Sequence, residues 1–239
     1  MKAIILAGGF GTRISEETDN KPKPMILIDD QPIIWHIMNT CATQGINEFI
    51  IALGYKGEVI KNWVSTFQEK NIWNVKTLDT GLNTQTGGRL AKCMANYAPN
   101  ERVLATYGDG LANIRLNQLI DFHIAHGKLA TVTAVRPPAR FGHLHLEGTE
   151  VKAFGEKNQA EEGWISGGFF ILEPGVSQFI GSESESFEYS ALPELARKGQ
   201  LRAYKHEGFW QPMDTLRERN DLTKLAKESP PPWLRNLVN

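Results

Sequence analysis

The sequence predicts a three-layer α/β fold with a Rossmann-like, mixed but mainly parallel central sheet. Short apolar runs end abruptly in glycine, as in Ala3–Ala7 before Gly8 and Phe49–Leu53 before Gly54. Such runs are typical of buried parallel strands. Segments with apolar residues at helical spacing follow them, and this alternation is typical of parallel strands joined by right-handed crossovers.

The first helix is predicted around Ile33–Cys41, with Pro32 at its first position and Gly45 at its end, and a second spans Glu58–Gln68. Further along the chain we expect a helix from the Thr86 region through Tyr97 and strands at Arg102–Thr106 and Ala130–Val135. Between these strands we expect a helix whose apolar face carries Leu116, Leu119, Ile120, His123 and Ile124. We expect His123, on that apolar face, to be a buried core histidine.

From His143 to Glu156 apolar and polar residues alternate, which predicts short, half-exposed strands. The remaining predicted elements are a buried strand within Ile165–Leu172, a short helix at Pro193–Lys198, a strand at Leu201–Tyr204 and a last helix near Leu216–Lys227. The tail around Trp233 is expected to be extended and to pack on a protein surface.

Composition restricts the function. The 239 residues are 41% apolar, enough for a large core, and carry 26 basic and 27 acidic residues. This balance gives no overall field that favours nucleic acid or a membrane surface, so any phosphate binding has to be local. Cys41 and Cys93 lie in no metal-binding pattern and are expected to be buried thiols. Without a signal-peptide pattern or a long apolar run, we expect a cytoplasmic protein.

A glycine-rich loop follows the first predicted strand. It runs Gly8-Gly9-Phe10-Gly11-Thr12-Arg13, and Lys23 lies between two prolines downstream. Glycine lets backbone N–H groups approach an anion, Thr12 adds a hydroxyl donor, and the two basic residues add charge. The loop matches neither of the common phosphate-binding glycine patterns. The residues alone favour a polyphosphate site over a glycine turn beside solvated charges.

Two aspartates are candidate metal ligands. Asp109 lies between Gly108 and Gly110 after a predicted strand, where a carboxylate can bind Mg²⁺ together with phosphate oxygens and water. A turn aspartate bonded to its own backbone would show the same pattern. Asp214 precedes the last helix, so the residues alone are equally consistent with a metal ligand and a helix N-cap.

Several motifs occur together along the chain. They are Lys21-Pro22-Lys23-Pro24, Asp79-Thr80-Gly81, Thr86-Gly87-Gly88-Arg89, Tyr107-Gly108-Asp109-Gly110, Arg140-Phe141-Gly142 and Gly208-Phe209-Trp210-Gln211-Pro212-Met213-Asp214-Thr215. With the glycine loop they resemble the signature of the nucleoside-diphosphate-sugar pyrophosphorylases, and within that family the cytidylyltransferases that use glucose 1-phosphate. The resemblance covers nearly the whole chain. It implies a glycosyltransferase-A-like nucleotidyltransferase fold with a β-rich sugar-binding half.

The resemblance implies a reaction and an organisation. CTP and a sugar 1-phosphate, glucose 1-phosphate first, would give a CDP-sugar and pyrophosphate with Mg²⁺ as cofactor. Residues 1–239 would form one domain, with a nucleotide-binding half at 1–115 and a sugar-phosphate-binding half with the C-terminal helix at 116–239. We expect a homo-oligomer, with no nucleic-acid or membrane partner.

The resemblance also implies the site residues. Arg13, Lys23 and Asp109 would be catalytic, and Asp109 and Asp214 would bind the metal. The implied nucleotide-binding residues are Leu6, Ala7, Gly8, Gly9, Gly11, Thr12, Thr86, Gly87, Gly88, Arg89 and Gly108. The implied sugar-phosphate-binding residues are Tyr107, Glu156, Lys157, Ser166, Gly167 and Gly168.

Two rival functions stay open. One is the same chemistry with UTP, dTTP or another phosphorylated acceptor, because Asn158 and Ser166 stand where the glucose enzymes usually have Pro and Asn, and Leu82–Gln85 replaces a shorter linker. The other is a non-catalytic subunit that senses nucleotide sugars. The presence of Arg13, Lys23 and both aspartates argues against the second.

Overall fold

The computed structural model describes residues 1–68, 73–137, 142–147, 149–156 and 163–237. The strands of its main sheet are β1 (Lys2–Leu6), β4 (Glu48–Leu53), β5 (Asn74–Asp79), β6 (Val103–Tyr107), β8 (Ala130–Val135), β11 (Ile165–Leu172) and β12 (Leu201–His206). The helices are α1 (Ser15–Thr18), α2 (Ile33–Ala42), α3 (Gly57–Gln68), α4 (Thr86–Tyr97), α5 (Leu116–His126), α6 (Ala191–Arg197) and α7 (Leu216–Ala226). The smaller strands are β2 (Leu27–Ile28), β3 (Gln31–Pro32), β7 (Gly110–Ala112), β9 (Gly142–Glu147), β10 (Glu150–Glu156) and β13 (Trp210–Pro212).

The main sheet is mixed but mainly parallel, which confirms the predicted fold class. Its seven strands follow the order β12-β8-β11-β6-β1-β4-β5. Strand β1 is parallel to β4 and β6, and only β11 runs against its neighbours. Val135 at the end of β8 pairs with Ile165 at the start of β11. The chain therefore leaves the sheet and returns at the same end, which forces β11 to be antiparallel.

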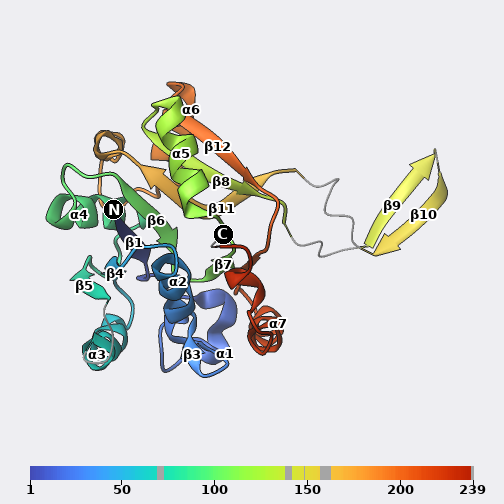
Figure 1. Cartoon of the computed structure of the whole chain (residues 1–239), viewed down its shortest axis with the longest axis horizontal. Helices are drawn as coiled ribbons and strands as arrows, with labels where there is room; N and C mark the ends of the chain where they lie inside the picture. The colour runs from blue at the N-terminus through green and yellow to red at the C-terminus, as the bar shows by residue number, and fades with distance from the viewer. Residues whose placement is uncertain (69–72, 138–141, 148, 157–162, 238–239) are drawn as a thin grey trace.

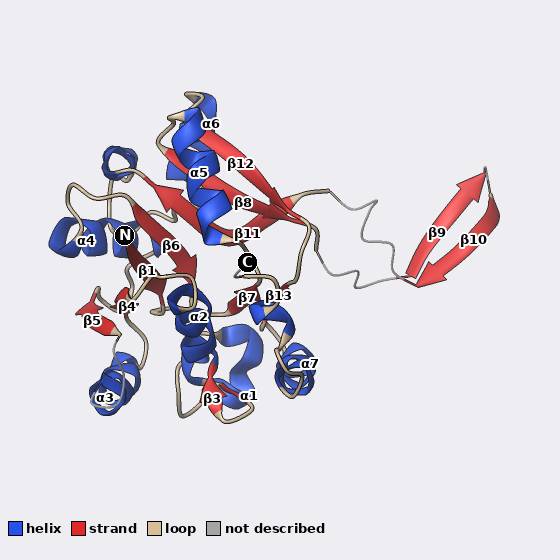
Figure 2. Cartoon of the chain, viewed as in Figure 1, coloured by secondary structure: helices blue, strands red, loops and turns tan. Residues whose placement is uncertain are grey.

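Helices cover both faces of the sheet (Figures 1 and 2). Because side chains alternate along a strand, Ala3 and Ile5 pack into one core with α2, α3, α5 and α7, whereas Ile4 packs into a second core with α4 and α6. Cys41 and Cys93 are buried free thiols, one in each core, as expected. Burial of both faces of the sheet explains why its central strands are almost wholly apolar.

Two of the differences between the predicted elements and the structure have a clear physical reason. Helix α2 begins at Ile33, one residue later than predicted, so Pro32 is its N-cap residue and not its first helical residue. Strand β5 was not predicted, because it lies at the edge of the sheet and only Val75 in it is fully buried. An edge strand with one buried side chain lacks the apolar run that identifies its neighbours.

Two smaller predictions concern His123 and the tail, and the first is confirmed. His123 is buried, with its ring nitrogens 2.8 Å from Thr131 Oγ1 and 3.1 Å from Glu173 Oε1. In the tail, the expected packing is confirmed but the extended conformation is wrong: Pro232–Leu234 form a short 3-10 helix, and Trp233 is fully buried against the rings of His36 and Phe209. The tail thus covers one face of this chain's own core.

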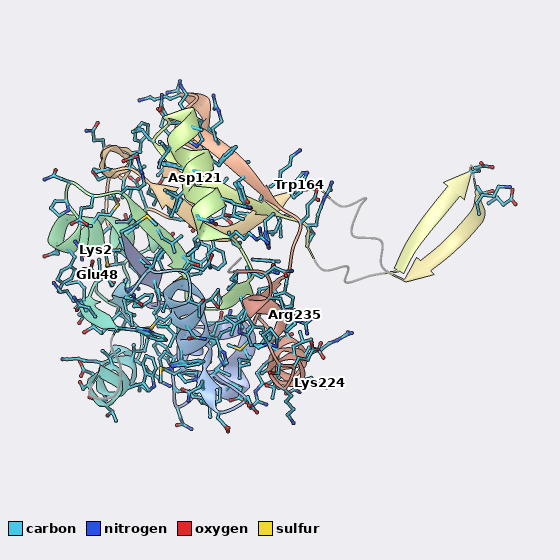
Figure 3. The ribbon with its side chains drawn as sticks, viewed as in Figure 1. Lys2, Glu48, Asp121, Trp164, Lys224 and Arg235 are labelled. Carbon is cyan, nitrogen blue, oxygen red and sulfur yellow. The ribbon has the colours of Figure 1, made fainter. Side chains whose placement is uncertain are left out.

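Strands β9 and β10 form an antiparallel hairpin that projects from the main body (Figure 1). Trp164 lies where the chain re-enters the sheet (Figure 3), with the Arg136 guanidinium 4.4 Å and the Lys205 ammonium 5.4 Å from its ring centre. Among the described residues, none of the helices has the length and apolar character needed to cross a membrane.

Candidate active site

A cavity of about 440 Å³ opens at the carboxyl ends of β1 and β6. Parallel strands bring their following loops to the same edge of a sheet, which is where open α/β folds bind ligands. The predicted site residues that line this cavity are Leu6, Ala7, Gly8, Gly9, Gly11, Thr12, Lys23, Thr86, Arg89, Tyr107, Gly108 and Asp109.

The ammonium of Lys23 bridges two carboxylates beside this cavity. Its Nζ lies 2.7 Å from Asp109 Oδ2 and 2.7 Å from Asp214 Oδ1. Burial alone would lower the pKa of Lys23, but the two carboxylates outweigh burial and raise that pKa above its usual value. The three side chains form one charged cluster, the Lys23 cluster, although they are far apart in the sequence.

Backbone pairing explains how Asp214 reaches Asp109. Strands β7 and β13 form a short antiparallel ribbon in which Pro212 lies opposite Gly110. At its end, the Met213 N–H donates to the Asp109 carbonyl at 2.8 Å. Asp109 directly precedes β7 and Asp214 follows β13 by two residues, so the ribbon brings both carboxylates to the same edge of the sheet.

The structure shows whether Asp214 is the N-cap of the last helix. The N-cap of α7 is Thr215, whose hydroxyl accepts from the Glu218 N–H while the Glu218 carboxylate accepts from the Thr215 N–H. This is a complete capping box. Asp214 is therefore not the cap, and its carboxylate is paired with Lys23.

Arg89 is a second buried cation, with a different environment. Its guanidinium donates to the carbonyls of Gly8, Leu53 and Leu82 at 3.1, 2.8 and 3.1 Å, and to Thr80 Oγ1 at 2.6 Å. Burial lowers the pKa of Arg89, and the Asp79 carboxylate opposes this shift. We call these groups the Arg89 cluster. It ties the glycine loop to the ends of β4 and β5.

Gly87 and Gly88 have a structural role that the sequence did not indicate, and neither lines the cavity. The Gly87 N–H donates to the Glu185 carbonyl at 3.1 Å, so this N–H is not free to bind the nucleotide. A Cβ on Gly88 would lie 2.6 Å from the Glu183 Cα. Both glycines instead allow the segment 183–187 to pack directly on the first turn of α4.

Glu188 is a pocket-supporting residue that the sequence analysis missed. Its carboxylate accepts hydrogen bonds from Thr86, Ser186 and the Tyr107 hydroxyl. Burial alone would raise the pKa of Glu188, but these hydrogen bonds outweigh it and lower the pKa. The surrounding run of Ser and Glu resembles a solvated loop, so no local pattern identifies this buried acid.

Among the predicted sugar-binding residues that the structure describes, Tyr107 alone lines the cavity. Gly168 packs against its ring: Gly168 has φ +77°, and a Cβ there would lie 2.5 Å from Tyr107 Cδ2. The Gly167 carbonyl accepts from Trp210 Nε1 at 2.8 Å, and Ser166 is exposed. Gly168 therefore supports the Tyr107 ring from behind, and Ser166, Gly167 and Gly168 are not part of the cavity surface.

The structure does not bring Glu156 to the cavity. Glu156 is the last residue of β10, in the projecting hairpin (Figure 1). The chain leaves the main sheet between β8 and β11 to form this hairpin. The alternation of apolar residues predicted the strands but not that they project from the main body. Lys157 and the side chain of Arg13 lie outside the described part of the structure.

Comparison with known proteins gives the family. The family model described as nucleotidyl transferase matches residues 2–218. The chain belongs to the nucleotidyl transferase family. It is 44% identical to the glucose-1-phosphate cytidylyltransferase of Salmonella typhi, over 98% of each chain, and 39% identical to the probable glucose-1-phosphate cytidylyltransferase of Bacillus subtilis, over 98% of this chain and 99% of the relative.

Solved structures agree on the fold of this nucleotidyl transferase. HddC from Yersinia pseudotuberculosis matches with a TM-score of 0.74 and 22% identity, over 95% of this chain and 99% of that one. A putative glucose-1-phosphate thymidylyltransferase from Bacillus anthracis matches with a TM-score of 0.73 and 19% identity, over 95% and 96%. At these identities the likeness supports the fold alone.

The donor set of this nucleotidyl transferase fits a hard divalent cation. No group of three or more His, Cys, Asp or Glu residues with metal-binding geometry occurs in the part of the chain that the structure describes. The pair Asp109 and Asp214 offers two carboxylates that already converge on one cation, the Lys23 ammonium. Mg²⁺ usually takes one or two carboxylates and completes its shell with phosphate oxygens and water.

Proposed function

We propose that this nucleotidyl transferase joins CTP and a sugar 1-phosphate, glucose 1-phosphate first, to give a CDP-sugar and pyrophosphate. The observation that carries the proposal is the Lys23 cluster, in which a cation and two carboxylates meet beside a cavity at the carboxyl end of the sheet. The names and near full-length match of the Salmonella and Bacillus relatives support the choice of CTP and glucose 1-phosphate.

The reaction brings two anions together. A phosphate oxygen of the sugar phosphate attacks the α-phosphorus of CTP, and the bond from that phosphorus to the pyrophosphate oxygen breaks. Positioning and preorganised positive charge are therefore the main requirements. Lys23 faces the α-phosphorus in this proposal, and Arg13 binds the β- and γ-phosphate oxygens.

The glycine loop supplies neutral donors for the same phosphates. The backbone N–H groups of Gly9 and Gly11 have no acceptor among the described residues, and both residues line the cavity. Thr12 adds a hydroxyl beside them. Backbone donors in a glycine loop can approach phosphate oxygens closely without a side chain in between.

Asp109 and Asp214 are the proposed ligands of Mg²⁺. When bound, the ion would neutralise phosphate charge in the ground and transition states. The Lys23 ammonium occupies the position between the two carboxylates in this structure. A cation that took the same carboxylate oxygens would displace the Lys23 ammonium, which would then be able to turn toward the phosphates.

The remaining assignments belong to the same proposal. Residues 1–239 act as one domain, with nucleotide bound by 1–115 and sugar phosphate by 116–239. Lys157 binds the sugar phosphate, and Glu156, in the projecting hairpin, is given no contact with the sugar. In the same proposal the enzyme is cytoplasmic and a homo-oligomer.

Pyrophosphate release from a panel of CTP, UTP, dTTP, ATP and GTP with several sugar 1-phosphates tests the proposal. We expect the highest kcat/KM for CTP with glucose 1-phosphate and no release when Mg²⁺ is chelated. Preference for another nucleotide would overturn the assignment of CTP as the substrate but would leave the proposed nucleotidyl transfer unchanged. CTP binding without release with any acceptor would favour the non-catalytic alternative.

A further inference from the structure

One lysine has a backbone conformation that its side chain does not favour. Among the described residues, three non-glycine residues have positive φ: Asp29, Lys56 and Asn236. Asp and Asn adopt this region several times more often than other residues. Lys56, at φ +50°, is thus the outlier. Such a conformation persists only where surrounding contacts hold it, and it is often found at functional sites.

The Lys56 side chain holds the end of α1. Its Nζ donates to the Thr18 carbonyl at 2.8 Å and also to the Asp19 carbonyl. These carbonyls are at the C-terminus of the helix, where a cation is favoured. The left-handed turn at Lys56 therefore directs a charged donor to α1.

Thr18 transmits this contact to the phosphate-binding loop. The Thr18 hydroxyl donates to the Ile14 carbonyl at 3.3 Å, and Thr18 is buried. A Cβ added to Gly11 would lie 3.0 Å from Thr18 Cγ2 and 3.2 Å from Lys23 Cβ. Helix α1 thus packs directly under Gly11 and beside Lys23, and Lys56 fixes its far end.

Tyr55, the preceding residue, holds the other end of the same loop. Its N–H donates to the Gly8 carbonyl at 3.2 Å, and its ring centre lies 5.2 Å from that of Phe10. The Lys56 ammonium lies 4.9 Å from the Tyr55 ring centre. A single turn after β4 therefore contacts the loop at Gly8, at Phe10 and, through α1, at Gly11.

We propose that Lys56 is a positioning residue that holds the glycine loop and α1 in the geometry that binds a polyphosphate chain. The inference rests on the proposed function only in taking this loop as the triphosphate site. It requires no contact between Lys56 and the ligand, because Lys56 acts through α1 and Gly11.

The test measures binding of inorganic tripolyphosphate, CTP, CDP and CMP to the full chain by calorimetry. Lys56→Met removes the charge and keeps the backbone strain. We expect its affinity for tripolyphosphate and CTP to fall about tenfold, as for the loss of one or two hydrogen bonds to a charged group. The loss should be smaller for CDP and smallest for CMP, because the loop contacts the terminal phosphates.

Three further variants make the test specific. Lys56→Gly also removes the side chain but relieves the strain, so its melting temperature should stay close to that of the wild type while tripolyphosphate affinity falls as in Lys56→Met. Lys56→Arg keeps a charged donor and should keep most of the affinity. Lys61→Met, on an exposed lysine of α3, should change nothing.

Unchanged tripolyphosphate affinity in both Lys56→Met and Lys56→Gly would overturn the inference. So would an equal loss for CTP, CDP and CMP, or failure of the wild type to bind tripolyphosphate. If the predicted pattern is observed and yet the wild type releases no pyrophosphate from any substrate pair, the proposed reaction is wrong and the role of Lys56 stands.

Discussion

Lys23 and Arg89 line the same cavity, and both are buried, but they are held by different kinds of acceptor. Lys23 is paired with two carboxylates, whereas Arg89 donates to three carbonyls and a hydroxyl. A carboxylate can exchange an ammonium for a metal ion. A backbone carbonyl that loses a buried donor is left unsatisfied. The Lys23 cluster is therefore suited to chemistry and the Arg89 cluster to holding the cavity wall.

The largest expected effect is on stability at the Arg89 cluster. Arg89→Met removes four hydrogen bonds at once. The Leu82 carbonyl and the Thr80 hydroxyl lose the guanidinium as their donor, whereas the carbonyls of Gly8 and Leu53 keep the N–H groups of Tyr55 and Thr80. We expect the free energy of unfolding to fall by about 3 kcal/mol, measured by urea denaturation. Lys92→Met, on the same helix but partly exposed, is the matched control and should cost less than about 1 kcal/mol. Equal effects would remove the distinction between the two cations.

The next effect is on turnover at the Lys23 cluster. Lys23→Met removes a preorganised charge, so kcat should fall at least about 100-fold. Because the ammonium competes with a metal for both carboxylates, Mn²⁺ should bind the variant more tightly than the wild type when no nucleotide is present. Electron paramagnetic resonance of free Mn²⁺ measures this directly. Lys21→Met, which removes a more exposed neighbouring lysine, is the control.

Two outcomes would contradict this account of Lys23. Turnover close to that of the wild type would remove Lys23 from the catalytic machinery. Weaker or unchanged Mn²⁺ binding would show that the ammonium and the metal do not compete for Asp109 and Asp214.

A smaller effect on stability should show that the cap of α7 and the role of Asp214 are independent. Thr215→Ala removes the N-cap of α7 and should lower the free energy of unfolding by about 1 kcal/mol. The pairing of Asp214 with Lys23 does not use the Thr215 hydroxyl, so turnover measured well below the melting temperature should change less than about threefold. A loss of turnover as large as that of Lys23→Met would mean that the cap itself sets the position of the carboxylate.

The smallest effect lies outside both clusters. Burial is the main cause that lowers the pKa of His36, His123 and His206 below the usual 6.5. Their neutral forms stabilise the fold fully above pH 6.5, and this contribution is lost as the pH falls toward their folded-state pKa values. Melting temperatures from pH 8 to pH 5 should therefore decline below about pH 6.5. His123→Asn should make the decline shallower, and an unchanged slope would contradict this assignment.

The sequence predicted the Lys23 cluster better than the Arg89 cluster, for a physical reason. Lys23 and Asp109 each follow a recognisable local signal, a glycine loop with prolines and a glycine-flanked acid after a strand, and parallel strands bring such loops to one edge. Pairing of β7 with β13, which brings Asp214 to Asp109, follows only from long-range register. The family resemblance supplied that connection.

Arg89 shows where local pattern reading fails. The family resemblance implied that Arg89 and the two glycines before it bind the nucleotide. In the structure the glycines allow close packing of residues 183–187, and the guanidinium donates to backbone carbonyls. Which buried acceptors a cation meets depends on the three-dimensional path of several loops. The same holds for Glu188, whose buried position no property of its local sequence reveals.

The most direct test of the central claim is pyrophosphate release from CTP and glucose 1-phosphate by Asp109→Asn and Asp214→Asn, compared with the wild type at saturating Mg²⁺. These isosteric changes remove one charge each from the pair that converges on Lys23. The account predicts that each variant folds and loses at least about 100-fold in kcat. Near wild-type turnover in either folded variant would contradict it.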